Sequence, residues 1–82
     1  MIELKYHSDM RTLTQKTSEN CNAEDVNGVL AYLKTTYGKA CAKEAKKMLI
    51  VVNGTSIQLK DGFKTKLSDG DSVSFLPVCG GG

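Results

Sequence analysis

The residues best placed to do chemistry lie at the end of the chain, where Cys79 is followed by three glycines ending at Gly82. An exposed, ionised cysteine thiol is a nucleophile. Glycine has no side chain to pack and loses much conformational entropy when ordered, so this run adds nothing to stability. It can, however, carry an α-carboxylate into a channel too narrow for side chains. The plain alternative is a frayed terminus, but the glycines directly follow a predicted strand, which favours a functional tail.

Outside this tail the sequence shows no catalytic or metal-binding constellation. His7 is the only histidine, and without a second histidine or a carboxylate pair of evident spacing no metal site or hydrolase triad can be assembled. A solvated or packing role is therefore the better interpretation of His7. Cys21 and Cys41 are interpreted as small packing or surface residues. Because the three cysteines are odd in number and lack a Cys-x-x-Cys spacing, neither a disulfide framework nor a structural zinc site is predicted.

The segment that must position the tail is a predicted strand over residues 72–78. Val73 and Phe75 fall on one side of it, which is the period-two pattern of a strand with one face in a core. Pro77 has no amide hydrogen to donate, so strand pairing should stop near it. Upstream, the run 68–71 has the composition of a turn that reverses the chain between strands.

This end of the chain resembles that of the MoaD/ThiS family of small ubiquitin-like sulfur carriers, which includes the small subunit of molybdopterin synthase. The resemblance rests on Asp69-Gly70-Asp71, then Val73, Phe75 and Pro77, then the terminal pair Gly81-Gly82. The run Leu49-Ile-Val-Val-Asn-Gly54 is also similar to the family's internal strand and hairpin. Together with length and element order, the likeness covers nearly the whole chain, although the N-terminal half matches only in pattern.

The resemblance implies a protein-borne substrate rather than an enzyme by itself. An ATP-dependent adenylyltransferase related to ubiquitin-activating enzymes would convert the Gly82 carboxylate to an acyl-adenylate. A persulfide on a sulfurtransferase or cysteine desulfurase would then leave Gly82 as a thiocarboxylate. The tail would thread the partner active sites through Gly80 and Gly81, and the partner-binding residues would be Phe75, Leu76, Pro77 and Val78. The carrier would bind no cofactor or metal, since the partner uses the ATP.

The pathway that accepts the sulfur is left open by the sequence. The run Phe75-Leu76-Pro77 and a predicted second helix favour the small subunit of molybdopterin synthase, with a synthase like its large subunit as acceptor. Sulfur carriers for thiamine thiazole or tRNA thiolation share the remaining features. Alternatives from other classes are a ubiquitin-like modifier joined through Gly82 to a target lysine and a stand-alone binding module with an inert tail. Cys79 and Gly80 depart from the family pattern. The Cys79 thiol is either incidental, because the family reaction uses the terminal carboxylate, or has a sulfur-handling role.

Composition limits the class of protein. The chain has 82 residues, of which 40% are hydrophobic and 24% charged, as expected of one globular domain. Its net charge of +2 is too small to indicate a nucleic-acid or membrane-surface partner. No apolar run approaches the roughly 20 residues of a membrane span, and no signal peptide opens the chain. We therefore expect a cytoplasmic protein that binds neither nucleic acid nor membranes and is monomeric alone.

Three elements are predicted in the first half. Alternating residues at 2–7 predict a strand with Ile2, Leu4 and Tyr6 inward, and the polar run 11–18 is interpreted as an edge strand paired with it. A main helix is predicted from Asn22, as N-cap with Asp25 in the capping-box position, to Gly38 as the left-handed cap. Its apolar stripe recurs at helical spacing and comprises Val26, Val29, Leu30, Leu33 and Tyr37.

Before the final strand at 72–78, the second half is predicted to contain a short helix and two strands. In the helix, over 39–47, four lysines are interpreted as a solvated face, since no aromatic residues interleave for base stacking. The apolar run 48–52 predicts a strand buried on both faces or nearly so. Asn53-Gly54 is a strong hairpin signal, with Ile57 and Leu59 expected in the return strand. Phe63 and Leu67 are expected to plug one end of the core.

This element order is that of the β-grasp fold, an α+β architecture. We expect a mixed sheet of four to five strands, covered on one face by the main helix, with a short second helix and the first and last strands parallel at the centre. Residues 1–78 would form the domain and residues 79–82 a flexible glycine-rich tail. On the uncovered face, Leu76 beside the 48–52 strand would form an apolar patch of the kind that marks a partner surface.

Overall fold

The strands form one mixed sheet in the computed structural model, which describes residues 1–78. The expected flexible tail, residues 79–82, lies outside the described residues. The two central strands, β1 (Ile2–Tyr6) and β5 (Ser72–Leu76), are parallel. β2 (Ser18–Cys21) flanks β1 and β3 (Leu49–Val52) flanks β5, both antiparallel, and β4 (Thr55–Ser56) pairs with β3 to give the order β2-β1-β5-β3-β4.

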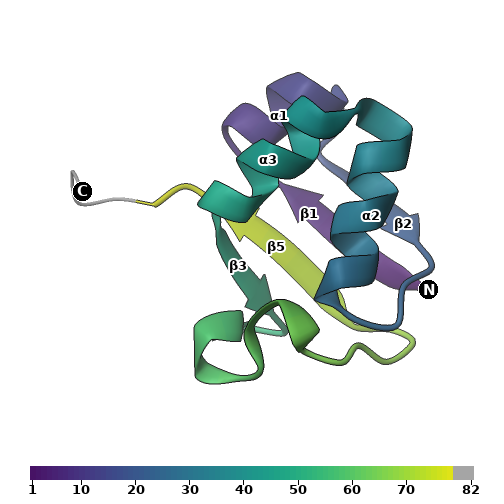
Figure 1. The fold of residues 1–82 in the computed structure, drawn as a ribbon, viewed down its shortest axis with the longest axis vertical. Coiled ribbons are helices and arrows are strands. Elements are labelled where there is room, and N and C mark those ends of the chain that lie inside the picture. Colours follow the sequence, from purple (N-terminus) through teal and green to yellow (C-terminus); the bar gives the residue numbers. More distant parts are fainter. Residues whose placement is uncertain (79–82) are drawn as a thin grey trace.

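One face of this sheet is covered by helices. The longest is α2 (Val26–Tyr37), which is followed at once by α3 (Lys39–Lys47), while α1 (Asp9–Thr14) joins β1 to β2. Figure 1 shows α2 and α3 packed beside each other over the strands, with α1 beyond the end of β1 and next to α3. Two 3-10 turns, η1 (Ile57–Leu59) and η2 (Gly62–Lys64), follow β4. None of the helices described in residues 1–78 is long and apolar enough to cross a membrane.

The core lies between the helices and the sheet, and it contains the side chains predicted to point inward. In β1, Ile2, Leu4 and Tyr6 are buried while the residues between them are exposed. The stripe of α2 is also confirmed, with Tyr37 partly buried against the core and the other four positions fully buried. The mixed sheet with its central parallel pair confirms the predicted β-grasp fold, and α1 is a helix that the sequence did not reveal.

The prediction of an edge strand over 11–18 is wrong. Residues 9–14 form α1, because Met10 and Thr14 lie one helical turn apart and are both buried. The Thr14 hydroxyl donates to the Met10 carbonyl at 2.7 Å, which satisfies its polar atom inside the helix. The strand that pairs with β1 comes later, at Ser18–Cys21, with Cys21 opposite Ile2.

The N-cap of the main helix lies three residues after the predicted one. Asp25, not Asn22, is the N-cap, and its Oδ1 accepts a hydrogen bond from the Gly28 amide at 2.7 Å. The amide of Leu67 donates to the Glu24 carbonyl at 2.9 Å. This backbone hydrogen bond keeps the segment before Asp25 extended. A tertiary contact therefore overrides the local sequence signal for an N-cap at Asn22. The predicted C-terminal end at Gly38 is confirmed, but Gly38, with a φ of +102° and a ψ of 172°, does not have the left-handed helical conformation predicted for it.

The hairpin at Asn53-Gly54 is confirmed, but the strands around it differ from the prediction. β3 is buried on one face only, since Leu49 and Val51 are half-exposed. The return strand β4 has only two residues, and the chain then turns into η1, where Leu59 is 82% exposed. Leu67 is buried as expected, but Phe63 is 40% exposed and does not plug the core.

Candidate functional site

The start of β5 is held by two interlocked turns. Asp71 accepts a hydrogen bond from the Ser68 amide at 2.8 Å through Oδ2 and one from Asn53 Nδ2 at 2.9 Å through Oδ1. These bonds lower the pKa of the Asp71 carboxyl. The side-chain oxygen of Asn53 accepts from the Ser72 amide at 2.9 Å. Gly70 has a φ of +92°, which glycine adopts without strain. The Asp69-Gly70-Asp71 motif therefore ties β5 to the Asn53-Gly54 hairpin.

Phe75 anchors the other end of β5 inside the core. Its side chain is fully buried and stacks on Tyr6, with ring centroids 6.0 Å apart and the rings inclined by 29°. Across the neighbouring pair it lies opposite Ile50. The expectation that Phe75 contacts a partner is therefore corrected, because a buried ring does not reach the surface. Its role is to fix where β5 leaves the fold.

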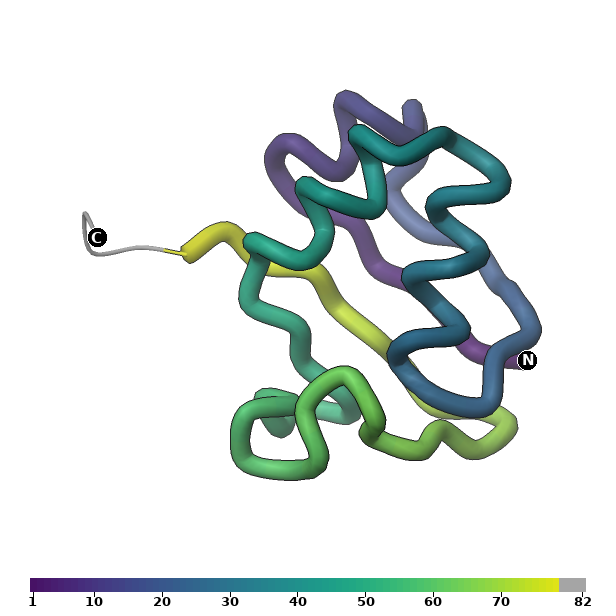
Figure 2. Tube along the Cα trace, in the orientation of Figure 1, coloured from purple at the N-terminus to yellow at the C-terminus, as the bar shows by residue number. Residues whose placement is uncertain are grey.

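Beyond Phe75 the chain leaves the core within one residue. Leu76 is half-exposed, Pro77 is exposed and Val78 is 66% exposed. β5 ends at Leu76, which confirms that pairing stops at Pro77, as its missing amide hydrogen requires. Because β1 and β5 are parallel, this exit lies at the end of the sheet away from Met1 (Figure 2).

An apolar patch lies beside this exit on the uncovered face of the sheet. Leu76 pairs with Leu49 across β5 and β3, and Val51 lies two residues further along β3, on the same face. All three side chains are half-exposed, and we call them the sheet-face patch. Towards β1 the face becomes polar, at Ser74 and Lys5. The predicted apolar surface around Leu76 is thus present.

The two thiols of the described chain lie inside the core, whereas His7 lies at the same end of the sheet as the exit, because it follows Tyr6, which pairs with Phe75. Cys21 and Cys41 are 3% and 1% exposed, and burial raises the pKa of both thiols, which keeps them protonated and unreactive. His7 is half-buried just after β1. Among residues 1–78, no three histidine, cysteine or acidic side chains are grouped so as to hold a metal ion.

A carboxylate surrounded by tyrosines was not foreseen from the sequence. Glu19 on β2 accepts hydrogen bonds from the hydroxyls of Tyr6 and Tyr32 at 2.6 Å and of Tyr37 at 2.5 Å. The Lys16 ammonium lies 3.2 Å from it. The Glu19 side chain is only 10% exposed.

These hydrogen bonds outweigh the cost of burying a charge. Burial alone would raise the pKa of Glu19, but the bonds from Tyr32, Tyr37, Tyr6 and Lys16 lower it to about 2. The carboxylate is therefore ionised in the folded protein. The sequence signal for this cluster was the position of Glu19 on the inward-facing side of a strand. The signal was missed because the edge strand was predicted at residues 11–18.

Comparison with known protein families assigns nearly the whole chain to one family. The model of the ThiS family matches residues 4–82, nearly the full length. The chain belongs to the ThiS family. Its members are ubiquitin-like sulfur carriers, which are small carriers or subunits rather than enzymes by themselves. No curated protein matches it significantly.

Solved structures share the fold of this ThiS-family protein. CysO from Mycobacterium tuberculosis is similar with a TM-score of 0.86 at 20% identity, over 96% of this chain and 100% of that chain. Small archaeal modifier protein 1 from Methanosarcina acetivorans has a TM-score of 0.84 at 23% identity, over 99% and 95%. A chain in the protein–protein complex of subunits 1 and 2 of molybdopterin-converting factor from Helicobacter pylori has a TM-score of 0.67 at 29% identity, over 98% and 97%.

The site residues predicted for this ThiS-family protein divide into three groups. Leu76, Pro77 and Val78 are brought together at the exit of β5, where they are accessible to a partner. Phe75 supports them from inside the core. Cys79 and the glycines at 80–82 lie outside the described residues, so their roles stay predictions.

Proposed function

We propose that this ThiS-family protein carries sulfur as a thiocarboxylate on Gly82. The α-carboxylate of Gly82 attacks ATP on an adenylyltransferase, giving an acyl-adenylate and releasing pyrophosphate. A persulfide on a sulfurtransferase or cysteine desulfurase displaces AMP and forms an acyl disulfide. A thiol of the partner then cleaves that disulfide and leaves the thiocarboxylate. Activation is needed because a carboxylate oxygen is a poor leaving group, and the use of ATP makes the cytoplasm the proposed compartment.

The observation that carries this proposal is the way β5 ends. The buried Phe75 ring holds the strand in the core, while Pro77 and Val78 are already exposed. Gly82 is the fourth residue after Val78, and four residues span at most about 14 Å when fully extended. A partner that binds the exposed residues Pro77 and Val78 would therefore find the Gly82 carboxylate within a limited distance of that contact.

The pathway we propose is molybdenum cofactor biosynthesis, with this chain as the small subunit of a molybdopterin synthase. The run Phe75-Leu76-Pro77 and the second helix favour this branch of the family. Support also comes from the Helicobacter pylori molybdopterin-converting factor complex, whose matching chain is 29% identical over nearly the full length of both chains. The acceptor would then be a synthase large subunit, which takes up the sulfur after the tail inserts.

The sheet-face patch supports a docking role beside the tail. Buried apolar contacts supply most of the binding energy of an interface, and Leu49, Val51 and Leu76 provide such contacts next to the exit. We propose that the adenylyltransferase and the acceptor synthase each cover this patch while they hold the tail. Because both would use the same surface, their binding would be mutually exclusive.

Intact mass spectrometry tests the chemistry. The protein is incubated with the adenylyltransferase of its own organism, ATP and a sulfur donor, and the expected product has one oxygen replaced by sulfur. Deletion of Gly82 should abolish this mass change, because small displacements from attack geometry reduce rates severely. The deletion should leave the free energy of unfolding within about 0.5 kcal/mol, as for a change at the surface. Full loading of the shortened chain would refute the role of Gly82.

Matched variants separate the alternatives. Cys79→Ser should load normally, because the incoming sulfur resides on the partner, and lost loading would give the Cys79 thiol a role.

Leu76→Ser should weaken binding to the adenylyltransferase about tenfold, as expected for an apolar contact at the centre of an interface. Ser72→Ala, on the same face of β5 but outside the patch, should bind normally. Covalent adducts on target lysines without any thiocarboxylate would instead establish a protein modifier.

A further inference from the structure

A groove lined by lysines lies where α2 meets α3. It has a volume of about 190 Å³ and is lined by Lys34 near the end of α2, by Ala42, and by Lys39, Lys43 and Lys46 of α3. The three α3 lysines follow one another at four- and three-residue spacing, which places them on one face of the helix. All four lysines are exposed, while Ala42 is buried beneath them.

These lysines have no acidic counterpart in the described part of the chain. The ion pairs that lysines form among residues 1–78 engage Lys5 and Lys16 instead. No acidic side chain lines the groove, and the one acidic residue of α3, Glu44, lines a different surface pocket together with Asp9. Like charges four residues apart, such as Lys39 and Lys43, destabilise a helix. The groove therefore concentrates positive charge on a protein whose net charge is only +2.

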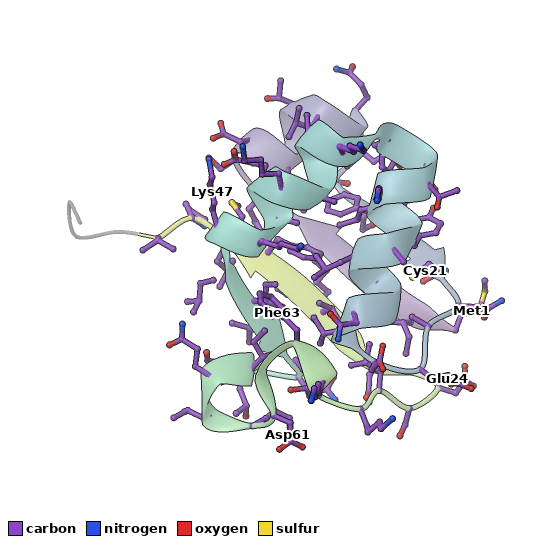
Figure 3. The ribbon with its side chains drawn as sticks, viewed as in Figure 1. Met1, Cys21, Glu24, Lys47, Asp61 and Phe63 are labelled. Carbon is purple, nitrogen blue, oxygen red and sulfur yellow. The ribbon has the colours of Figure 1, made fainter. Side chains whose placement is uncertain are left out.

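A second, apolar pocket adjoins the groove at Lys46, which lines both. This pocket has a volume of about 160 Å³, and its apolar lining comes from Met48, Leu49, Ile50, Ile57 and Phe63. It exists because, in the sheet of residues 1–78, β4 pairs only with the last two residues of β3, so Leu49 and Ile50 have no described strand beside them on that edge. Figure 3 shows Phe63 on η2, below the end of α3, and its ring is 40% exposed.

We propose that the lysine groove and the apolar pocket together bind an acidic segment of a partner protein. Carboxylates of the segment would lie along Lys34, Lys39 and Lys43, and one apolar side chain would enter the pocket against Phe63 and Met48. An acidic peptide with an apolar anchor matches both surfaces, since charge complementarity steers association and a buried apolar side chain supplies affinity. A polyphosphate would use the groove alone. A nucleic acid would require aromatic side chains among the lysines for base stacking, and none lines the groove.

The position of this surface relative to β5 supports a protein occupant. Leu49 lines the apolar pocket and pairs with Leu76, the last residue of β5. Lys47, at the end of α3, lies on the same side of the molecule as the exit of β5 (Figure 3). A partner that holds the end of the chain would therefore lie within reach of the groove. Such docking would take place whether or not Gly82 carries sulfur.

A titration with a defined peptide tests the proposal. The probe is a short acetylated peptide in which a run of glutamates precedes a leucine–phenylalanine pair, and its binding to the isotope-labelled protein is followed by NMR and calorimetry. Shifts are expected in the amides of α3 and of residues 62–63. The double variant Lys39→Glu with Lys43→Glu should weaken binding about tenfold, through like-charge repulsion. Its matched control, Lys60→Glu with Lys66→Glu, makes the same charge change outside both pockets and should bind as the unaltered protein does.

The apolar pocket is tested separately. Phe63→Ser should weaken binding about tenfold, as for an anchor contact, whereas Leu59→Ser removes a more exposed apolar side chain outside the pocket and should have no effect. Equal binding by a peptide with serines in place of the leucine–phenylalanine pair would overturn the proposal, because simple charge attraction would then suffice. Tighter binding of inorganic polyphosphate or of a short RNA of equal charge would overturn it too, as would failure of the peptide to bind. Amide spectra of each variant verify that it is folded.

Discussion

Tyr32 on α2 donates a hydrogen bond of 2.6 Å to Glu19 Oε1 on β2, so the main helix and the edge strand are joined through one carboxylate. Within the described sheet, β2 pairs only with β1. It is four residues long, and a strand so short gains little from pairing on one side. The bonds from Tyr6 and Tyr37 to the same carboxylate give β2 a second attachment to the core.

Glu19→Gln should lower the free energy of unfolding by about 2–3 kcal/mol, since hydrogen bonds to a charged acceptor contribute about 1.5–3 kcal/mol. The glutamine has one acceptor oxygen in place of two, and its amide hydrogens would face hydroxyl donors. Urea denaturation measures the change. Glu24→Gln, at an exposed position, is the control and should stay within about 0.5 kcal/mol. Equal stability of the two variants would show that the tyrosine contacts contribute nothing.

Stability should fall in acid through the protonation of Glu19. Its pKa is about 2 in the folded protein against an ordinary value of 4.5, and a lowered pKa stabilises the fold wherever the unfolded chain binds more protons. The contribution, about 3 kcal/mol, is present in full above pH 4.5 and is lost as the pH falls towards 2. Thermal denaturation across this range measures it. In Glu19→Gln the acid sensitivity should be much reduced, with the remainder due to other carboxyls such as Asp71.

The tyrosines should resist ionisation in base. All three tyrosines of the chain donate to Glu19. Burial and the hydrogen bond to Glu19 raise the pKa of Tyr37 to about 12 and raise that of Tyr6 as well, and the bond to Glu19 raises the pKa of Tyr32. We therefore expect little tyrosinate absorbance from the folded protein at pH 10, the ordinary tyrosine pKa.

The same chain unfolded in urea is the control for this titration and should be half ionised near pH 10. A raised pKa stabilises the fold fully below the ordinary value, and that stabilisation is lost as the pH rises through the folded value. Base should therefore unfold the protein as the tyrosines ionise. Coincident titration curves for the folded and unfolded chain would contradict the cluster.

The corrected start of α2 gives a prediction with an internal control. Asp25→Ala should lower the free energy of unfolding by about 1 kcal/mol, because the Asp25 carboxylate accepts from the Gly28 amide at the first turn. Asn22→Ala should have an effect below about 0.5 kcal/mol, since Asn22 is exposed and is not the N-cap. Chemical denaturation of both variants decides between the two caps. A larger loss for Asn22→Ala would restore the cap predicted from the sequence.

The sequence by itself determined the elements whose signals are local and regular. The alternation in β1 and β5 and the stripe from Val26 to Tyr37 each reflect a period that one buried face imposes on neighbouring residues. The turns at Asn53-Gly54 and Asp69-Gly70 are local for another reason, since positive φ is confined mainly to glycine and asparagine. The end of β5 before Pro77 follows from a missing amide hydrogen. These features were sufficient for the β-grasp fold, and the assignment of the terminal glycines as the reacting end stays a proposal.

Tertiary structure decided the features that depend on contacts between distant residues. The start of α2 moved to Asp25 because Leu67 pairs with Glu24 from across the fold, and no local pattern encodes that contact. The run that starts at Asp9 forms a helix because the Met10 side chain is buried in the core, although the residues beside Met10 are polar. The contacts of Glu19 with three tyrosines, and the groove between α3 and Lys34, form only when separate elements pack together. Burial and local charge are properties of the folded chain, so no single segment of sequence encodes them.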